Sequence, residues 1–540
     1  MPQPKWYGKS LSALCMDNIV LNMEKFTALR SLEHVSWHFY HMPSHCLEYV
    51  TECLLKEYSI TEDMFHLLLS PHLKVLDLSQ YHLGTGCDAN RNLRIFRLAS
   101  DRCLQLTTLK LYEDWVPKRK RNFEVEETFA CSLQLFEHLQ ILDLSGTIYG
   151  ARSMLKLGST NKPKIRELIV DSCPGVNDTV VEVFCKGQSS LQKLSVYGTE
   201  VTHSGIRFAI EHLPELKELN CSKESDKILK AFRSIRKETR ECKKYSLTKH
   251  DMSTSYEVSY KKGSVSLMVD MCPSLASVHI FLGVNDEGFT NEELLGFREL
   301  KQLKNLTIVV SLSIMPFSIR GGVIPLLQAR GHTLEELCLS MEVTSEEVYH
   351  IIECCPNVRR LLLDIKGMNL ETPELLFDHS FPWDLETPEL VVDDRVHSSL
   401  CSPKEVFPLR MLDSLRFYNF SRVAKYDISR KLLLLLLSSP TLTDIFINEC
   451  LTLDDQIIEE ACTKNSFKYL TKLNFRNCYN VSQKGIDFFL NEANPLSEII
   501  LDNCGNELNL ENMKTMAQEK HWKVKIVVEY EEDFHFPYEH

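Results

Sequence analysis

The chain has 540 residues, of which 44% are hydrophobic and 25% charged, the proportions of a folded protein with a large core. Its formal net charge of −13 argues against nucleic acid as a partner, because an acidic surface repels phosphate backbones. The longest apolar run, residues 432–437, is too short to cross a membrane, and residues 1–10 contain no apolar signal-peptide core. We therefore expect a soluble, intracellular protein whose 19 cysteines are reduced.

Residues 10–20 (SLSALCMDNIV) predict a helix with Ser10 as its N-cap. Its apolar side comprises Leu11, Leu14, Cys15, Met16 and Ile19. The spacing Ser-Leu-x-x-x-Cys-x-x-x-Ile resembles the BC box, a short helix that inserts into elongin C. This resemblance implies that Leu11, Leu14, Cys15 and Ile19 bind elongin C in a helix-in-groove mode. The small Cys15 side chain would allow the helix to approach the groove closely.

Residues 42–50 (MPSHCLEYV) form a second short motif. It resembles the cullin-2 box, in which an apolar residue and proline precede apolar residues at helical spacing. The positions that this resemblance assigns to cullin binding are Met42, Pro43, Cys46 and Val50. Residues 42–55 also resemble the first helix of an F-box, although the later tryptophan of an F-box is absent. A third interpretation is that both predicted helices only cap the repeats that follow.

From residue 73 onwards a short pattern, φ-x-x-φ-x-φ with apolar φ, recurs in 14 copies. It begins with LKVLDL at residues 73–78 and ends with LSEIIL at residues 496–501. Most neighbouring copies start 24 to 33 residues apart. Alternate apolar residues in each copy predict a short parallel strand, which can bury its apolar side only by stacking on its neighbours.

Two gaps between copies are about twice as long as the rest, and each is expected to hide one degenerate repeat. Insertions are predicted near residues 222–262 and 366–403. The first contains a helix with a basic side, interpreted as a solvated convex helix, with docking of an acidic partner as the alternative. The second is acidic and proline-containing, and predicts a surface loop, with a binding loop as the alternative. The basic residues 118–121 predict a solvated loop, with a nuclear import signal as the alternative.

Several predicted strands are followed by cysteine at the same offset, namely Cys173, Cys450, Cys478 and Cys504. Proline often precedes the strand, where it ends a helix and favours extended backbone. The pattern resembles the cysteine-containing leucine-rich repeat. It implies an α/β solenoid with parallel strands on the concave face, helices on the convex face, and a small N-terminal helical cap. The expected organisation is a cap at residues 1–60, a solenoid at 61–530 and an acidic tail at 531–540.

The two N-terminal motifs, in this order, resemble a von Hippel–Lindau box. Such a box before leucine-rich repeats resembles the N-terminal half of the Zyg/Zer family of cullin-2 substrate receptors. This resemblance implies a non-catalytic subunit that binds elongin B, elongin C, cullin-2 and a protein substrate. The Zyg/Zer family carries armadillo repeats after its leucine-rich repeats, whereas here the strand pattern runs nearly to residue 540, so substrate preferences tied to that module do not transfer.

No nucleophile elbow, phosphate-binding loop, zinc-protease motif or C-x-x-C pair occurs, and we expect neither an enzyme nor a bound cofactor. His34, His38, His41 and His45 have helical spacing, but Pro43 would interrupt that helix, so no metal site is predicted. The substrate is expected on the concave face, at Lys74, Asp77, Lys110, Asp143, Ser195, Asn220, Glu336 and Asn474. The competing hypotheses are a scaffold without a ligase and an enzyme with an unrecognised site. The expected location is the cytoplasm, with the nucleus as a second compartment.

Overall fold

The computed structural model forms two compact units, residues 1–250 with 267–275, and residues 251–266 with 276–540. It describes residues 10–28, 32–57, 60–79, 89–111, 123–160, 162–221, 227–238, 243–253, 260–283, 288–310, 317–341, 343–364, 409–418, 428–490, 495–505, 508–519 and 524–529. The basic residues 118–121 and the acidic insertion 366–403 lie outside these ranges.

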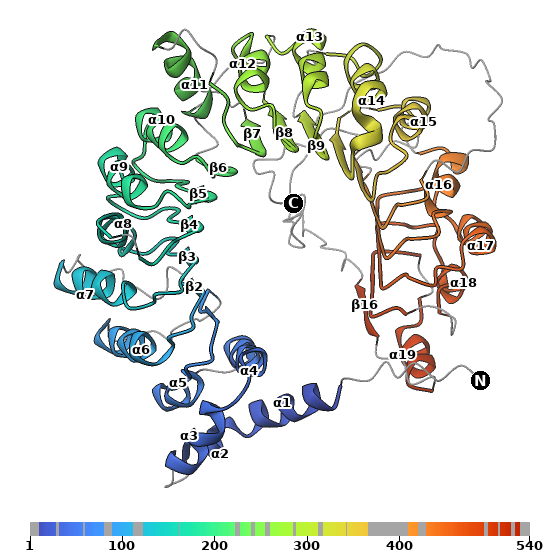
Figure 1. Cartoon of the computed structure of the whole chain (residues 1–540). Helices are drawn as coiled ribbons and strands as arrows, with labels where there is room; N and C mark the ends of the chain where they lie inside the picture. Colours follow the sequence, from blue (N-terminus) through green and yellow to red (C-terminus); the bar gives the residue numbers. More distant parts are fainter. Residues whose placement is uncertain are drawn as a thin grey trace, which may run out of the picture. The chain divides into compact units, whose positions relative to one another are not determined.

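The first unit begins with a helical head, shown in dark blue in Figure 1. Its helices are α1 (Leu11–Leu21), α2 (Met23–Ala28), α3 (Leu32–Tyr40) and α4 (Ser44–Glu57). Helix α4 is the centre of the head, because Leu47, Val50 and Leu54 on one side of it are fully buried. The predicted N-cap of α1 is present, since the Ser10 hydroxyl accepts a hydrogen bond from the Ala13 amide at 3.1 Å.

A six-stranded parallel sheet follows the head, with its strands in chain order. The strands are β1 (Val75–Asp77), β2 (Thr108–Lys110), β3 (Ile141–Asp143), β4 (Glu167–Ile169), β5 (Lys193–Ser195) and β6 (Glu218–Asn220). The helices around them are α5 (Glu62–Leu68), α6 (Ala89–Arg102), α7 (Phe123–Leu133), α8 (Gly150–Gly158), α9 (Asp178–Gly187), α10 (His203–His212) and α11 (Lys227–Glu238). Figure 1 shows these helices together on one side of the strands. We call the opposite side of each sheet its open face.

The head covers the edge of this sheet through α4. The Ser44 hydroxyl accepts a hydrogen bond from the Lys74 amide at 3.1 Å, and the Glu48 carboxylate accepts one from the Val75 amide at 3.2 Å. These are edge-strand groups that would otherwise lack a neighbouring strand. The expectation of a helical cap is therefore confirmed, and polar side chains of α4 take the place of a preceding repeat.

The second unit contains a ten-stranded sheet with the order β16 to β7. Its strands are β7 (Lys249–Ser253), β8 (Ser277–Leu282), β9 (Asn305–Val310), β10 (Glu336–Ser340), β11 (Arg360–Asp364), β12 (Ser414–Tyr418), β13 (Asp444–Asn448), β14 (Lys472–Arg476), β15 (Glu498–Asp502) and β16 (Lys525–Glu529). The α-helices between and after them are α12 (Ser264–Met271), α13 (Asn291–Leu295), α14 (Ile324–Arg330), α15 (Ser345–Cys354), α16 (Arg430–Leu437), α17 (Asp455–Lys464), α18 (Gln483–Asp487) and α19 (Leu510–Glu519).

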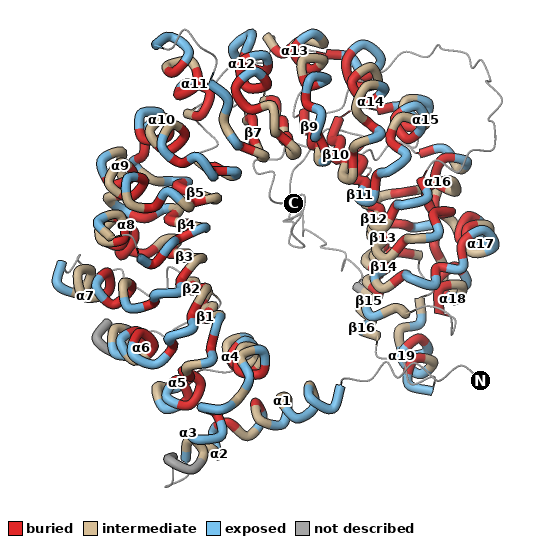
Figure 2. The backbone as a smooth tube through the Cα atoms, in the orientation of Figure 1, coloured by how far each residue is buried: buried red, intermediate tan, exposed pale blue. Residues whose placement is uncertain are grey.

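The core lies between strands and helices, where Figure 2 shows the buried segments. The φ residues form ladders through it, as in the fully buried Leu142, Leu168 and Leu194, which are paired in register on β3, β4 and β5. The repeated cysteine has a defined place beside these ladders. The Cys173 thiol donates to the Leu144 carbonyl at 2.9 Å, and the Cys504 thiol reaches the Phe475 carbonyl at 3.4 Å.

The described cysteines are unbridged. Burial raises the pKa of the Cys173 thiol to about 12 and that of the Cys504 thiol to about 11. Both side chains therefore stay protonated at neutral pH and act as small apolar residues with a weak donor.

The structure shows which of the two long gaps between copies of the pattern contains a further repeat. The first contains β7, so the predicted degenerate repeat is confirmed, and α11 buries Ile228, Phe232 and Ile235 as expected. At the second gap, β11 pairs directly with β12 from Arg360↔Ser414 to Asp364↔Tyr418, so no repeat strand lies between these two. The prediction of a hidden repeat there was wrong, since chain length alone does not distinguish a repeat from an insertion. Strand β16 is an additional repeat strand that the apolar pattern did not identify.

A substitution in the φ ladder tests the repeat packing. Leu194→Ala removes a fully buried side chain and is expected to lower the free energy of unfolding by about 2–5 kcal/mol. Lys193→Ala, one residue earlier on the open face, is expected to change it by less than about 0.5 kcal/mol. Urea unfolding followed by circular dichroism measures both, and equal midpoints for the two variants would contradict the packing.

Candidate functional site

One side of α1, which carries Leu11, Leu14, Cys15 and Leu21 together with Asn18, is not used for packing in the head. Leu11 and Leu14 are 78% and 51% exposed, and Leu21 and Cys15 are also exposed. The opposite side of the helix holds it to the head, because Val20 is buried and the Tyr49 hydroxyl of α4 donates to the Asp17 carboxylate at 2.6 Å. That hydrogen bond is the main reason why the pKa of Tyr49 is raised to about 12.

The structure therefore brings three of the four residues predicted to bind elongin C onto one exposed surface. Leu11, Leu14 and Cys15 lie within a little over one turn of α1, whereas Ile19 is half-buried at the side of the helix. A helix that only capped the solenoid would turn such leucines inward. The surface formed by Leu11, Leu14, Cys15 and Leu21 is called the α1 surface below.

The second predicted motif is divided between surface and core. Pro43 is exposed immediately before α4, and Met42 is half-buried. Cys46 and Val50, by contrast, are buried in the packing of the head. Their side chains support α4 and do not offer a surface in this conformation, so any contact of this motif with a partner has to use the region around Pro43.

An aromatic surface beside Pro43 was missed by the sequence reasoning. Trp37 and Tyr40 on α3 are 60% and 51% exposed, and the rings of Trp37 and His41 lie 4.4 Å apart between centroids. The available signal was the spacing of two large aromatic residues three positions apart, which places them on one side of a helix. Exposed tryptophan and tyrosine are enriched at protein interfaces.

Metal binding has no support in the described part of the chain. No group of three histidine, cysteine or acidic side chains in these ranges could hold a metal ion. Pro43 separates His45, at the start of α4, from His38 and His41, so these histidines do not share one continuous helix.

The open face of the first sheet carries a row of charged side chains. Lys110 Nζ lies 2.8 Å from Asp77 Oδ2, and this hydrogen bond is the main cause of the raised pKa of Lys110. Asp143 accepts hydrogen bonds from the Ser145 amide at 3.0 Å and the Ser145 hydroxyl at 2.6 Å. These side chains, with the exposed Lys74, occupy the face predicted for a protein substrate.

Two further predicted positions on this sheet differ from one another. Asn220 is exposed, whereas Ser195 is only 2% exposed and its hydroxyl donates to Asp171 at 2.6 Å. Burial raises the pKa of Asp171, and Ser195 is occupied in supporting that carboxylate. Ser195 therefore holds the Asp171 carboxylate in place and has almost no surface with which to contact a protein substrate.

The open face of the second sheet combines polar and apolar residues. Glu336 forms an ion pair with Arg360, and Asn474 Oδ1 accepts a hydrogen bond from Arg476 Nε at 3.3 Å. Both predicted residues lie on the open face. The same face carries an apolar cluster on β9, β10, β11 and β12 that the repeat pattern did not reveal, formed by Val309, Cys338, Leu362 and Tyr418.

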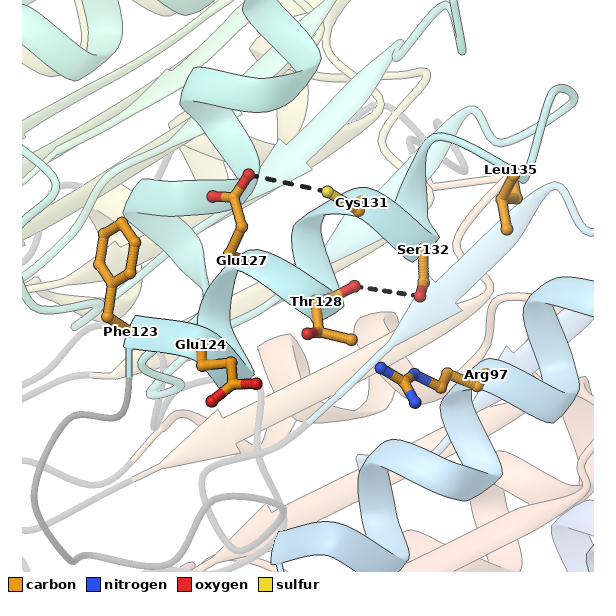
Figure 3. A pocket seen from close by; sticks show the side chains of 8 residues that line it. All are labelled: Arg97, Phe123, Glu124, Glu127, Thr128, Cys131, Ser132 and Leu135. Atoms are coloured by element: carbon orange, nitrogen blue, oxygen red, sulfur yellow. Dashed lines mark hydrogen bonds between the residues drawn. The ribbon is translucent and has the colours of Figure 1, made fainter.

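A hollow of about 670 Å³ lies on the helical side of the first unit, beside α6 and α7 (Figure 3). Its lining includes Arg97, Glu124 and the exposed Phe123. The neighbouring Arg152 guanidinium stacks 4.1 Å from the Phe123 ring centroid, and Arg152 and Lys156 also pair with Glu127 at 2.5 and 2.8 Å. Hydrogen bonding to Lys156 is the first cause of the lowered pKa of Glu127. Glu127 and Phe123 in the lining therefore serve to pack α7 against α8.

None of the helices in the described ranges is both long and apolar enough to span a membrane. No protein-family model matches the chain, and no curated protein matches it. Among solved structures, a chain of the Rad7–Elc1 complex in yeast aligns over 88% of this chain and 96% of its own length, with 14% identity and a TM-score of 0.42. An internalin from Listeria monocytogenes aligns over 73% and 82%, with 11% identity and a TM-score of 0.33.

The fold class follows from the chain's own geometry. Short parallel strands in chain order, φ ladders between strands and helices, and cysteine thiols bonded to the carbonyls of the preceding strand together define a leucine-rich-repeat solenoid of the α/β class. The sequence prediction of this fold is confirmed.

The second motif has a buried residue, Val50, and an exposed one, Pro43, and substitutions at the two positions test how the head is packed. Val50→Ala is expected to lower the free energy of unfolding by about 1–3 kcal/mol, because it leaves a cavity beneath α4. Pro43→Ala, at an exposed position, is expected to leave stability within about 0.5 kcal/mol. Hydrogen exchange of the α1 and α4 amides measures both variants, and unchanged protection in Val50→Ala would show that Val50 does not support the head.

Proposed function

We propose that this chain is a non-catalytic substrate-recognition subunit of a cullin-RING ubiquitin ligase. In this proposal α1 binds elongin C, which brings elongin B, and the region around Pro43 contacts cullin-2. A protein target is held on the open face of the repeats, and the bond-forming chemistry belongs to other subunits. The cytoplasm is the proposed location, with the nucleus as a second compartment.

The observation that carries this proposal is the exposure of Leu11, Leu14 and Cys15 on a single side of α1. A capped helix that presents apolar side chains away from its own core matches the helix-in-groove mode of recognition. Burial of each leucine in a partner groove contributes about 1.5–3 kcal/mol. Cys15, on the same side of the helix as the two leucines, is small enough to let the helix backbone approach the groove.

The arrangement of the head agrees with a docking role for α1. Asp17 and Val20 attach the helix to α4 from one side, so the α1 surface is held in position before a partner arrives. Prior ordering of a recognition helix lowers the entropy cost of binding. The head is also joined to β1 through Ser44 and Glu48, so a ligase subunit on α1 would be linked to the sheet of the first unit.

The alternatives are a repeat scaffold without a ligase, and an F-box-type receptor that uses a Skp-type adaptor. The burial of Cys46 and Val50 favours the scaffold, because it gives the second motif a structural role that needs no partner. The exposed Trp37 and Tyr40 favour a partner at the same region of the head. Recovery of associated subunits from cells distinguishes these possibilities.

The test is affinity purification of the full chain from cells with the proteasome inhibited. Wild-type protein is expected to recover elongin B and elongin C, and Leu11→Ser with Cys15→Phe is expected to reduce recovery at least about tenfold, since the anchor is lost and the close approach is blocked. Ser12→Ala, exposed on the same helix, is the matched control and is expected to behave as wild type.

Thermal unfolding should be unchanged in the double variant, because both side chains are exposed. Absence of elongins from the wild-type preparation would exclude the proposed ligase role. Recovery of a Skp-type adaptor in their place would support the F-box alternative.

A further inference from the structure

The open face of the second sheet contains a built apolar site. Val309, Cys338, Leu362 and Tyr418 are only 3%, 4%, 4% and 8% exposed, although they lie on the side of the strands that faces away from the helices. Phe281 and Phe446 pack against them and remain half-exposed, with the Tyr418 and Phe446 ring centroids 4.7 Å apart. We call these six residues the open-face cluster. The positions on the first sheet that are equivalent to Cys338 and Leu362 carry charged residues such as Asp77 and Lys110.

A half-exposed strip connects this cluster to the last strand of the sheet. Phe446 on β13 is in register with Asn474, then Ile500, then Val527 on the three following strands. All four side chains are half-buried and lie on the open face by strand alternation. An extended segment that starts beyond β16 could therefore follow apolar surface for most of the way to the cluster.

A buried polar group at the margin of the cluster lacks a partner. Asn448 is fully buried and in register with Tyr418, and its Oδ1 accepts a hydrogen bond from Asn477 at 3.4 Å. Its Nδ2 has no hydrogen-bond partner among the residues that the structure describes. Unpaired buried donors are rare in folded proteins, so this amide marks the edge of the cluster as an unusual environment.

Residues 530–540 (YEEDFHFPYEH), which follow β16 directly, have the chemistry for this surface. Phe534, Phe536 and Tyr538 alternate, so they lie on one side of the segment when it is extended. Pro537 favours extended backbone at the residue before it. The alternation places Asp533, His535 and Glu539 on the opposite side, away from an apolar surface.

We infer that residues 530–540 bind the open-face cluster of their own chain as an extended segment, with Phe534, Phe536 and Tyr538 against the half-exposed Phe281 and Phe446 at its surface. The reach is sufficient, because the segment extends to about 36 Å. Leu362, at the centre of the cluster, is five strands from β16, which is about 24 Å. Binding within one chain also benefits from an effective concentration of about millimolar.

The binding itself does not depend on a ligase role. Its consequence does rest on the proposed function: the segment would occupy part of the face proposed for a target, so a target would have to displace it. Elongin recovery depends on α1 and is measured separately, so failure of one proposal is distinguishable from failure of the other.

The test uses a fluorescent peptide of residues 530–540 and two full-length proteins, wild type and F534S/F536S/Y538S. The triple variant, whose own segment has lost its aromatic side, is expected to bind the peptide at least about tenfold more tightly than wild type in an anisotropy titration. Equal affinities, or no binding to the triple variant, would overturn the inference. Wild-type dimers in sedimentation that the triple substitution abolishes would show exchange between two copies and would also overturn it.

The site is mapped in the triple-variant background. Phe446→Ser is expected to weaken peptide binding about tenfold, whereas Tyr197→Ser, an exposed aromatic change in the first unit, should leave it unchanged. A peptide with Phe536→Ser should lose affinity, and one with His535→Ser should keep it. This peptide pair decides the question even if Phe446→Ser fails to fold, and equal binding of the two peptides would contradict the extended arrangement.

Discussion

The structure depends on the stacking of one short strand on the next. A strand of three to five residues, such as β3 or β10, buries its φ side chains only when a neighbouring repeat covers them. The leucine ladders are therefore continuous across each sheet, and the repeated cysteine ties one repeat to the preceding one through a thiol-to-carbonyl hydrogen bond. No single repeat is stable by itself, so stability accumulates along each sheet.

Stacking also creates an edge that has to be covered. At β1 this is achieved by α4, whose Ser44 and Glu48 side chains accept hydrogen bonds from edge-strand amides. Once α4 is placed, α1 is fixed on it through Asp17 and Val20, and the other side of α1 is left apolar and exposed. The same head thus completes the sheet and presents the surface on which the proposed partner depends.

The open faces show how one position in the repeat decides the chemical character of the exposed side of a sheet. The residue between the last two φ positions is Asp143 on β3 but Cys338 on β10 and Leu362 on β11. The helix-facing ladders are alike in both sheets, because they must pack into a core. The open-face residues are free of that constraint, and they form charged pairs in the first unit and an apolar cluster in the second.

Periodicity in the sequence was sufficient for the fold class, for every strand except β7 and β16, and for the N-cap at Ser10, because each depends on local spacing. The tertiary structure was needed for features that depend on neighbours distant in the chain. Length did not show that β11 pairs with β12, and an apolar pattern did not show that Val50 is buried while Leu11 is exposed. The open-face cluster could not be predicted from the sequence either. Its members are single residues on separate strands, and only the parallel register brings them together.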